Sequence, residues 1–467
     1  MTRTRPRGGP VAGRGCVAAL IVALAWGAFA FGAVYPWAYS LMLVAVAVSA
    51  TLGLMSRGAA GPLLPGRGLC VALLSIGAVA CVQLLPLPVA VIRTVSPATD
   101  DTLRQLRLPY AAGLDTVHAL SIAPEATLVG LVLFVCLAAL LCALVNVFSI
   151  RGVSSVANAI VVIGVALAVI AIVQKPLYNG GIYGFWKPFS PEAKPFGPFV
   201  NRNHFAGWML MALPLSLGTL LASIAQGAHA RRPTIRERVV WLGSAHGSRM
   251  LATGLAVIVM GLSLVMTTSR SGISAFIVSV VLSGCVFTRG FSGRLLKSAF
   301  AGYLALLTVC AIGWAGTDIV TTRFAALDAA EFDLRADAWS DAFRLARTFP
   351  WTGTGLNTYG TATLIHQTAD PSHHFLEAHN DYLQLAAEGG LLLVMPVAVV
   401  LGLFVREVTR RADETASHAS WWIRRGAIMG LVSIALQEAV DFSLQMPGNA
   451  VLFTVLAAIA IHRAPRS

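Results

Sequence analysis

Charged residues are scarce in this sequence. Only 12% of its 467 residues are Asp, Glu, Lys or Arg, whereas soluble proteins carry roughly 25%. Hydrophobic residues make up 57% of the chain, and the mean hydropathy is +0.74. This composition excludes a water-soluble multidomain enzyme of the same length, because too few polar side chains are present to cover its surface.

Cysteine is also rare. None of the seven cysteines lies in a CxxC or other metal-ligand spacing, and all of them fall within apolar runs. In such a setting a free cysteine behaves as a small hydrophobic residue. The sequence therefore predicts no disulfide framework.

Long apolar runs, by contrast, are abundant. A bilayer core of roughly 30 Å is crossed by a helix of about 20 mostly apolar residues. Twelve runs predict such spans, at 16–35, 38–55, 68–86, 126–148, 152–174, 204–226, 248–267, 270–288, 296–314, 384–405, 424–442 and 448–463. The first run has features of a cleaved signal peptide, but eleven further spans favour an uncleaved helix. The predicted fold is all-α, a single polytopic membrane domain over residues 1–467.

The excess of positive charge indicates orientation in a bilayer. The chain has 34 Lys and Arg against 21 Asp and Glu, a net charge of +13. With both termini in the cytoplasm, 22 basic and 4 acidic residues lie on the cytoplasmic side, and 12 basic and 17 acidic residues lie outside. This distribution follows the positive-inside rule. Topology thus explains the charge, and we expect no binding of nucleic acid.

A large loop over 315–383 separates the ninth and tenth predicted spans on the outer side. It is too long for a bare connector. Within it, residues 328–348 have helical spacing of apolar and charged side chains, which predicts an amphipathic helix on or near the membrane surface. A turn is expected at 350–357.

Two arginines fall on the side that the positive-inside rule disfavours. Arg202 lies in the segment 201–207 (NRNHFAG) before the sixth span, and Arg270 lies in the short turn 269–272 (SRSG) between two spans. A lone arginine at such a place can be an anchor on lipid phosphates. The asparagines and histidine around Arg202 favour a polar pocket instead. Guanidinium groups bind phosphate oxygens bidentately, so two arginines at helix ends suit a lipid diphosphate.

A third segment, 377–390 (EAHNDYLQLAAEGG), leads from the large loop into the tenth span. In a helix, Asn380, Gln384 and Glu388 would form a polar stripe entering the bilayer, and the two glycines would permit close helix contact. Ionisable residues at such a boundary indicate function. His379 lies at the start of the stripe, and histidine exchanges a proton near neutral pH. The alternative is a structural, hydrogen-bonded histidine.

A zinc site is a competing interpretation of the same region. The residues that it would draw on are His366, His373, His374, Glu377, His379 and Asp381. Their spacing matches no standard zinc motif, and adjacent histidines point in different directions on a helix. We expect no metal.

Two carboxylates, Glu438 and Asp441, lie three residues apart at the outer end of the eleventh predicted span. They are expected to pair with the arginines or to hold His379 in one tautomer. A purely structural ion pair is an equally open alternative.

Taken in order, these motifs resemble a known family. They are NxNHFAG at 201–207, TSRSG at 268–272, Arg335 followed by Pro350 and GxGxxxY at 353–359, HNxYL at 379–383 with ExG at 388–390, and DFxLQxP at 441–447. The arrangement is similar to that of the O-antigen ligase and O-antigen polymerase superfamily. The resemblance extends over roughly residues 200–450.

The resemblance implies an inverting, metal-independent glycosyltransferase without a cofactor, at the periplasmic face of the bacterial inner membrane. The donor would be a glycan on undecaprenyl diphosphate. The acceptor would be a hydroxyl of lipid A core, of a second lipid-linked glycan or of a protein. The implied site residues are the base His379, the substrate-binding residues Arg270, Arg202, Arg335, Asn203 and Asn380, and the supporting residues Glu388, Asp441 and Tyr382.

Two alternatives stay open at this point. A ligase, a polymerase and a protein O-oligosaccharyltransferase need the same donor site and the same base, so the motifs do not separate them. A membrane transporter is the alternative from another class. Transporters usually place ionisable residues near the middle of the bilayer in repeated halves, whereas here these residues cluster at one face.

Overall fold

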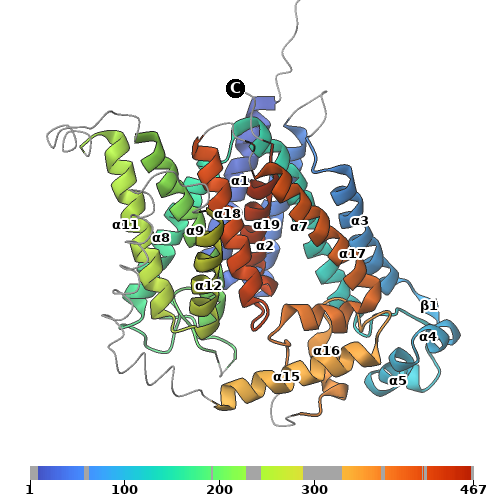
Figure 1. Cartoon of the computed structure of the whole chain (residues 1–467). Helices are drawn as coiled ribbons and strands as arrows, with labels where there is room; N and C mark the ends of the chain where they lie inside the picture. The colour runs from blue at the N-terminus through green and yellow to red at the C-terminus, as the bar shows by residue number, and fades with distance from the viewer. Residues whose placement is uncertain are drawn as a thin grey trace, which may run out of the picture.

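The computed structural model describes residues 9–56, 63–190, 193–227, 243–287, 329–369, 374–412, 414 and 418–463. Within these ranges the chain is mostly helical, as predicted, and Figure 1 shows the long helices packed side by side as a bundle. These helices are α1 (Gly9–Phe29), α2 (Pro36–Met55), α3 (Arg67–Leu84), α7 (Pro124–Arg151), α8 (Ser154–Gln174), α9 (Arg202–Gly227), α11 (Ala245–Met266), α12 (Arg270–Phe287), α17 (Asp381–Arg411), α18 (His418–Gln437) and α19 (Pro447–Ile461).

Shorter elements cover one end of the bundle. They are η1 (Phe31–Ala33), β1 (Leu87–Pro88), α4 (Val89–Val95), α5 (Pro97–Leu106), α6 (Leu108–Ala111), β2 (Val117–His118), α15 (Ala329–Thr348), α16 (Tyr359–His366) and η4 (Ser443–Gln445). Strands β1 and β2 pair antiparallel. Figure 1 shows α4, α5, α15 and α16 at the end away from the C-terminus. We call this the α15 end.

Eight of the described helices are long and apolar enough to cross a membrane: α1, α2, α3, α7, α8, α9, α11 and α17. Two shorter apolar helices, Arg270–Val281 of α12 and Pro447–Ile461, add to them. Helix α18 does not reach the same hydropathy, because Arg424 and Arg425 are adjacent within it. The predicted span at 296–314 lies outside the described residues, so the structure supports a multi-pass architecture but not the predicted count of twelve.

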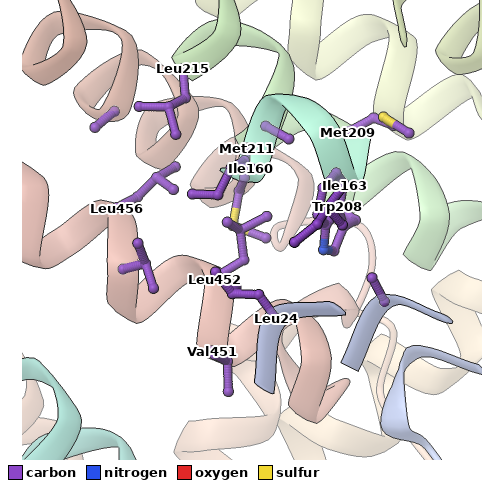
Figure 2. Close-up of a cluster of buried hydrophobic side chains, with 14 of the residues drawn as sticks. Leu24, Ile160, Ile163, Trp208, Met209, Met211, Leu215, Val451, Leu452 and Leu456 are labelled. Carbon is purple, nitrogen blue, oxygen red and sulfur yellow. The ribbon is translucent and has the colours of Figure 1, made fainter. Parts of the chain in front are cut away.

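Helix α9 lies at the centre of the bundle. Its apolar residues face all directions, which is typical of a helix surrounded by other helices. Figure 2 shows Trp208 and Met211 of this helix in a cluster with side chains of α1, α8 and α19, including Leu24, Ile160 and Leu452. The site described below begins at the first turn of α9, so the same central helix holds both the core and the site.

Glycines bring α18 into close contact with α9. A Cβ on Gly426 would lie 2.5 Å from the carbonyl oxygen of Pro214, and one on Gly218 would lie 2.5 Å from that of Trp422. Small residues at such crossings let helix backbones approach, which is a common way to associate helices in lipid. The first half of α18 thereby packs closely against the second half of α9.

A second, smaller hydrophobic core lies at the α15 end. It joins Leu103 and Tyr110, from segment 87–125 between the third and fourth predicted spans, to Ala338, Leu345 and Phe349 from α15 and its end. The predicted topology places this segment on the outer side. The predicted amphipathic helix at 328–348 is confirmed as a helix by α15. In Figure 1 this helix runs across the end of the bundle rather than along it. Residues 315–328 and 370–373 of the large loop lie outside the described residues.

Candidate active site

The two arginine motifs come together at the starts of α9 and α12. Arg202 is the first residue of α9, and Arg270 is the first residue of α12. Nη1 of Arg202 donates a hydrogen bond of 3.3 Å to Oγ1 of Thr268. A Cβ on Gly272 would lie 2.7 Å from the Cβ of Ala206, so only glycine permits this approach. Motifs far apart in the sequence therefore share one place in the fold.

Asp441 links this place to α15. It is fully buried in the connection between α18 and α19. Its Oδ2 lies 3.9 Å from Nη2 of Arg335 and accepts a hydrogen bond of 3.3 Å from Oγ of Ser271, the residue after Arg270. Burial raises the pKa of Asp441 to about 6, although the charge of Arg335 and hydrogen bonds from Ser271 and the Phe442 amide act to lower it.

His379 lies next to the same connection. It is half-buried, and the centroid of its ring is 4.7 Å from that of Phe442 in an edge-to-face contact. Its carbonyl oxygen accepts a hydrogen bond of 3.1 Å from Nε1 of Trp339 on α15. The backbone of His379 has φ +51°, which is uncommon for a residue other than glycine and tends to occur at functional sites.

Asn380 is the N-cap of α17. Its Oδ1 accepts hydrogen bonds from the amides of Tyr382 and Leu383, at 3.1 and 3.0 Å, and its Nδ2 donates to the carbonyl of Ala439 at 2.8 Å. The hydroxyl of Tyr382 donates to the carbonyl of Ala435 at 2.7 Å. Both side chains attach α17 to α18 and so hold His379 at the helix start.

Asn203 is buried in the first turn of α9. Its carbonyl oxygen accepts hydrogen bonds from Nε2 of Gln437, at 3.1 Å, and from Oγ of Ser443, at 3.3 Å. A Cβ on Gly207 would lie 2.7 Å from the Cβ of Ser443. The start of α9 therefore packs directly against the segment that carries Asp441.

Glu388 holds the turn after α15 against α17. Its carboxylate accepts hydrogen bonds from the amides of Asn357, at 2.6 Å, and Tyr359, at 3.0 Å. Nε2 of Gln384 also donates to it, at 3.2 Å. Two residues of the predicted polar stripe are thus joined, whereas the third, Asn380, is the N-cap of the helix. Gln83 of α3 supports the same turn by donating to the carbonyl of Glu388 at 3.0 Å.

Gly389 and Gly390 were predicted to allow close contact with another helix. This prediction is wrong, because the segment that Gly390 contacts closely is a turn. Gly390 has φ +54°, which interrupts α17, and a Cβ there would lie 2.6 Å from the amide nitrogen of Gly353. A Cβ on Gly353 would lie 2.1 Å from the carbonyl oxygen of Glu388. The contact is thus between α17 and the turn at 349–358, because the interrupted helix exposes backbone to which this turn binds.

Further carboxyl groups lie beside His379. Oε2 of Glu377 accepts a hydrogen bond of 2.6 Å from Nε2 of Gln384. Burial raises the pKa of Glu377 to about 8 despite this hydrogen bond. Nε2 of Gln445 donates to Oδ1 of Asp381 at 2.7 Å. These amides connect the acidic groups near the start of α17 into one network.

The histidines that were weighed as zinc ligands have other neighbours. Nε2 of His366 lies 2.8 Å from Oγ1 of Thr102, and Nε2 of His374 lies 2.8 Å from the carbonyl oxygen of Gly360. Among the residues that the structure describes, no group of three or more His, Cys, Asp and Glu is arranged to hold a metal ion. His373 lies outside those residues.

Several residues of the site were missed by sequence reasoning. Gln83 could have been found from the sequence, because it is a lone amide inside an apolar run. In the structure it is fully buried. Phe442 belongs to the motif at 441–447, but the motif assigned it no role. Trp339, which also contacts His379, offered no signal, because aromatic residues are common at membrane boundaries.

Part of this chain matches a known protein family. Residues 255–398 match the family model of the O-antigen ligases. The predicted resemblance is therefore confirmed, and the match together with the apolar helices supports a multi-pass membrane glycosyltransferase of the O-antigen ligase superfamily. No curated protein sequence matches the chain.

The O-antigen ligase match covers only part of the site. It includes Arg270, Arg335 and His379, whereas Arg202 and Asp441 lie beyond its two ends. The contacts of Arg202 with Thr268, and of Asp441 with Arg335, attach these outlying residues to the matched region.

Proposed function

We propose that this protein transfers a glycan from undecaprenyl diphosphate to an acceptor hydroxyl at the periplasmic face of the bacterial inner membrane. The observation that carries the proposal is the meeting of α9, α12, α15 and the start of α17 around Asp441 and Phe442. These elements bring Arg202, Arg270 and Arg335 to the region of His379. Such a combination suits a reaction in which an anionic group leaves and a proton is removed.

The arginines are proposed to bind the donor diphosphate. Arg202 and Arg270 each begin a helix, and helix N-termini favour anions through their exposed amide groups and their dipole. Arg335 approaches the same place from α15. As the sugar–phosphate bond breaks, negative charge grows on the leaving diphosphate, and fixed positive groups stabilise that charge.

His379 is proposed as the general base. It would take the proton of the acceptor hydroxyl while the oxygen of that hydroxyl forms a bond to the anomeric carbon. The bond from this carbon to the diphosphate breaks on the opposite side, and its electron pair leaves with undecaprenyl diphosphate. Configuration inverts, and the chemistry draws on neither a metal nor a cofactor. Asn380 and Tyr382 support this role by holding the start of α17.

The acceptor defines the alternatives within the family. A ligase would offer a hydroxyl of lipid A core, a polymerase would offer a second lipid-linked glycan, and a protein O-oligosaccharyltransferase would offer a protein side chain. We favour the ligase because the matching family is described as O-antigen ligase. Transport is disfavoured because the ionisable groups of the candidate site lie at one end of the bundle, whereas transporters usually place such groups near the middle of the bilayer.

The test is the glycoconjugate profile of a deletion strain complemented with variants. His379→Ala and Arg270→Ala are expected to lose finished polysaccharide and to accumulate lipid-linked glycan, with transfer reduced at least about a hundredfold. Arg347→Ala, at an exposed position late in α15, is the matched control and should behave as wild type.

Two outcomes would overturn the proposal. Full-length polysaccharide from the His379→Ala protein would exclude the base assignment. Unchanged polysaccharide in the deletion strain itself would favour a transporter. A chelator added to the purified enzyme should leave transfer intact, and strong inhibition would exclude the metal-independent mechanism.

A further inference from the structure

Phe442 contacts two imidazole rings. Its ring centroid lies 4.7 Å from that of His379, with the planes at 83°, and 4.7 Å from that of His204, with the planes at 76°. Both are edge-to-face contacts of the kind that aromatic pairs favour. His204 belongs to α9, whereas Phe442 lies between α18 and α19. One phenyl ring thus joins the proposed base to a second histidine that has no role in the reaction as proposed above.

His204 is held tightly in this position. It is buried, and its Nε2 has no hydrogen-bond partner among the residues that the structure describes. Its carbonyl oxygen accepts a hydrogen bond of 3.0 Å from Nδ2 of Asn449, which also donates to the carbonyl of Ser443 at 3.0 Å. A buried polar atom nearly always has a partner, and leucine would fill this space without isolating a nitrogen. The edge-to-face contact of the His204 ring with Phe442 accounts for a histidine at this position.

The backbones of His379 and Phe442 belong to one hydrogen-bonded unit. The amide of Asp381 donates to the carbonyl of Glu438 at 3.0 Å, and Nδ2 of Asn380 donates to the carbonyl of Ala439 at 2.8 Å. These bonds fix where the backbone of His379 lies. They do not fix how its imidazole is rotated about the side-chain bonds, which depends on what the ring contacts.

We propose that Phe442, backed by His204, is a positioning residue that keeps the imidazole of His379 in the orientation in which it accepts the proton. This inference rests on the proposed function. Neither side chain needs to touch the donor or the acceptor, since both act through His379. A misoriented base slows the chemical step while leaving substrate binding intact, because catalysis depends on near-attack geometry.

The test compares two phenylalanines that each contact a histidine edge to face. Phe442→Leu removes the ring beside His379. Phe349→Leu removes a ring whose centroid lies 5.4 Å from that of His366, with the planes at 89°, in the core at the α15 end. Both variants and His379→Ala are purified in detergent, checked for folding by thermal unfolding, and given undecaprenyl-diphosphate-linked glycan with lipid A core. Release of undecaprenyl diphosphate is followed across pH.

We expect Phe442→Leu to lower kcat about tenfold or more, to keep the KM for donor within about twofold, and to move the pH midpoint of kcat. Phe349→Leu should lose stability without moving that midpoint. His204→Leu should also lower kcat, but by a smaller factor than Phe442→Leu. A Phe442→Leu enzyme with unchanged kcat and midpoint, or with a raised KM and unchanged kcat, overturns this inference alone. Activity in His379→Ala overturns the proposed function as well.

Discussion

Asp441 shows how single residues acquire their roles in this protein. From the sequence, this carboxylate could pair with an arginine, hold His379 in one tautomer or form a purely structural ion pair. In the structure its Oδ2 lies 3.9 Å from Nη2 of Arg335. Spacing along the chain could not make this choice, because Arg202, Arg270 and Arg335 all lie on the predicted outer side. Arg335 becomes the partner of Asp441 because α15 lies across the end of the bundle.

The raised pKa of Asp441 predicts a stability change with pH. The pKa is about 6 in the folded protein, above the ordinary value of 3.8, so folding favours the protonated form. This contribution is fully present below the ordinary value and is lost as pH rises through about 6, by about 2–3 kcal/mol. Asp441→Asn cannot ionise and should escape the loss. Thermal unfolding between pH 4 and 7 should therefore show wild type losing stability relative to the variant.

The control for this measurement is Asp101→Asn, at an exposed position of α5. This variant removes an exposed carboxyl group and so controls for the loss of one carboxyl group as such. A flat difference for Asp441→Asn would contradict the prediction and would mean that the Asp441 carboxyl titrates at its ordinary value.

At the scale of elements, the start of α17 is the most specialised part of the fold. Two residues of its predicted polar stripe, Gln384 and Glu388, are joined by a hydrogen bond. The interruption at Gly390 was not predicted, because a double glycine in an apolar run is equally compatible with a continuous helix. The turn at 349–358 lies against this interruption and carries amides that bind Glu388.

This packing predicts that Gly353→Ala is strongly destabilising. Its Cβ would meet the carbonyl of Glu388 at 2.1 Å, and the backbone of Gly353 has φ +63°. We expect a loss on the order of 3 kcal/mol or more, measured by thermal unfolding in detergent. At Gly402, which lies in α17, a Cβ would meet no atom within 4 Å, so Gly402→Ala should be neutral or stabilise by up to about 1 kcal/mol. Equal effects of the two substitutions would contradict this account.

At the scale of the whole molecule, the charge of the loops predicts which end of the bundle faces the periplasm. The α15 end carries the loop 87–125 and helix α15, both on the predicted outer side, and the C-terminus lies at the other end (Figure 1). The two predicted sides thus fall at opposite ends of the structure. Orientation relative to the membrane follows from the positive-inside rule alone.

Reporter fusions test this orientation. Alkaline phosphatase inserted after Gly113, a position with open space around it, should be active, because the enzyme folds only in the periplasm. A fluorescent protein fused after Ser467 should fluoresce, because it matures in the cytoplasm. Inactive phosphatase together with a dark C-terminal fusion would reverse the topology and move the proposed site to the cytoplasmic face.

Composition and periodicity by themselves predicted most of the long apolar helices that the structure describes, because a chain in lipid must satisfy its backbone hydrogen bonds locally and therefore forms helices. They also placed Arg202 and Arg270 at helix starts and marked His379 as the candidate base. Only the tertiary structure decided that Glu388 binds the amides of a distant turn, and that Phe442 contacts both His204 and His379. Such contacts join segments far apart in the chain, and they depend on helix approaches set by a few glycines rather than on any local pattern.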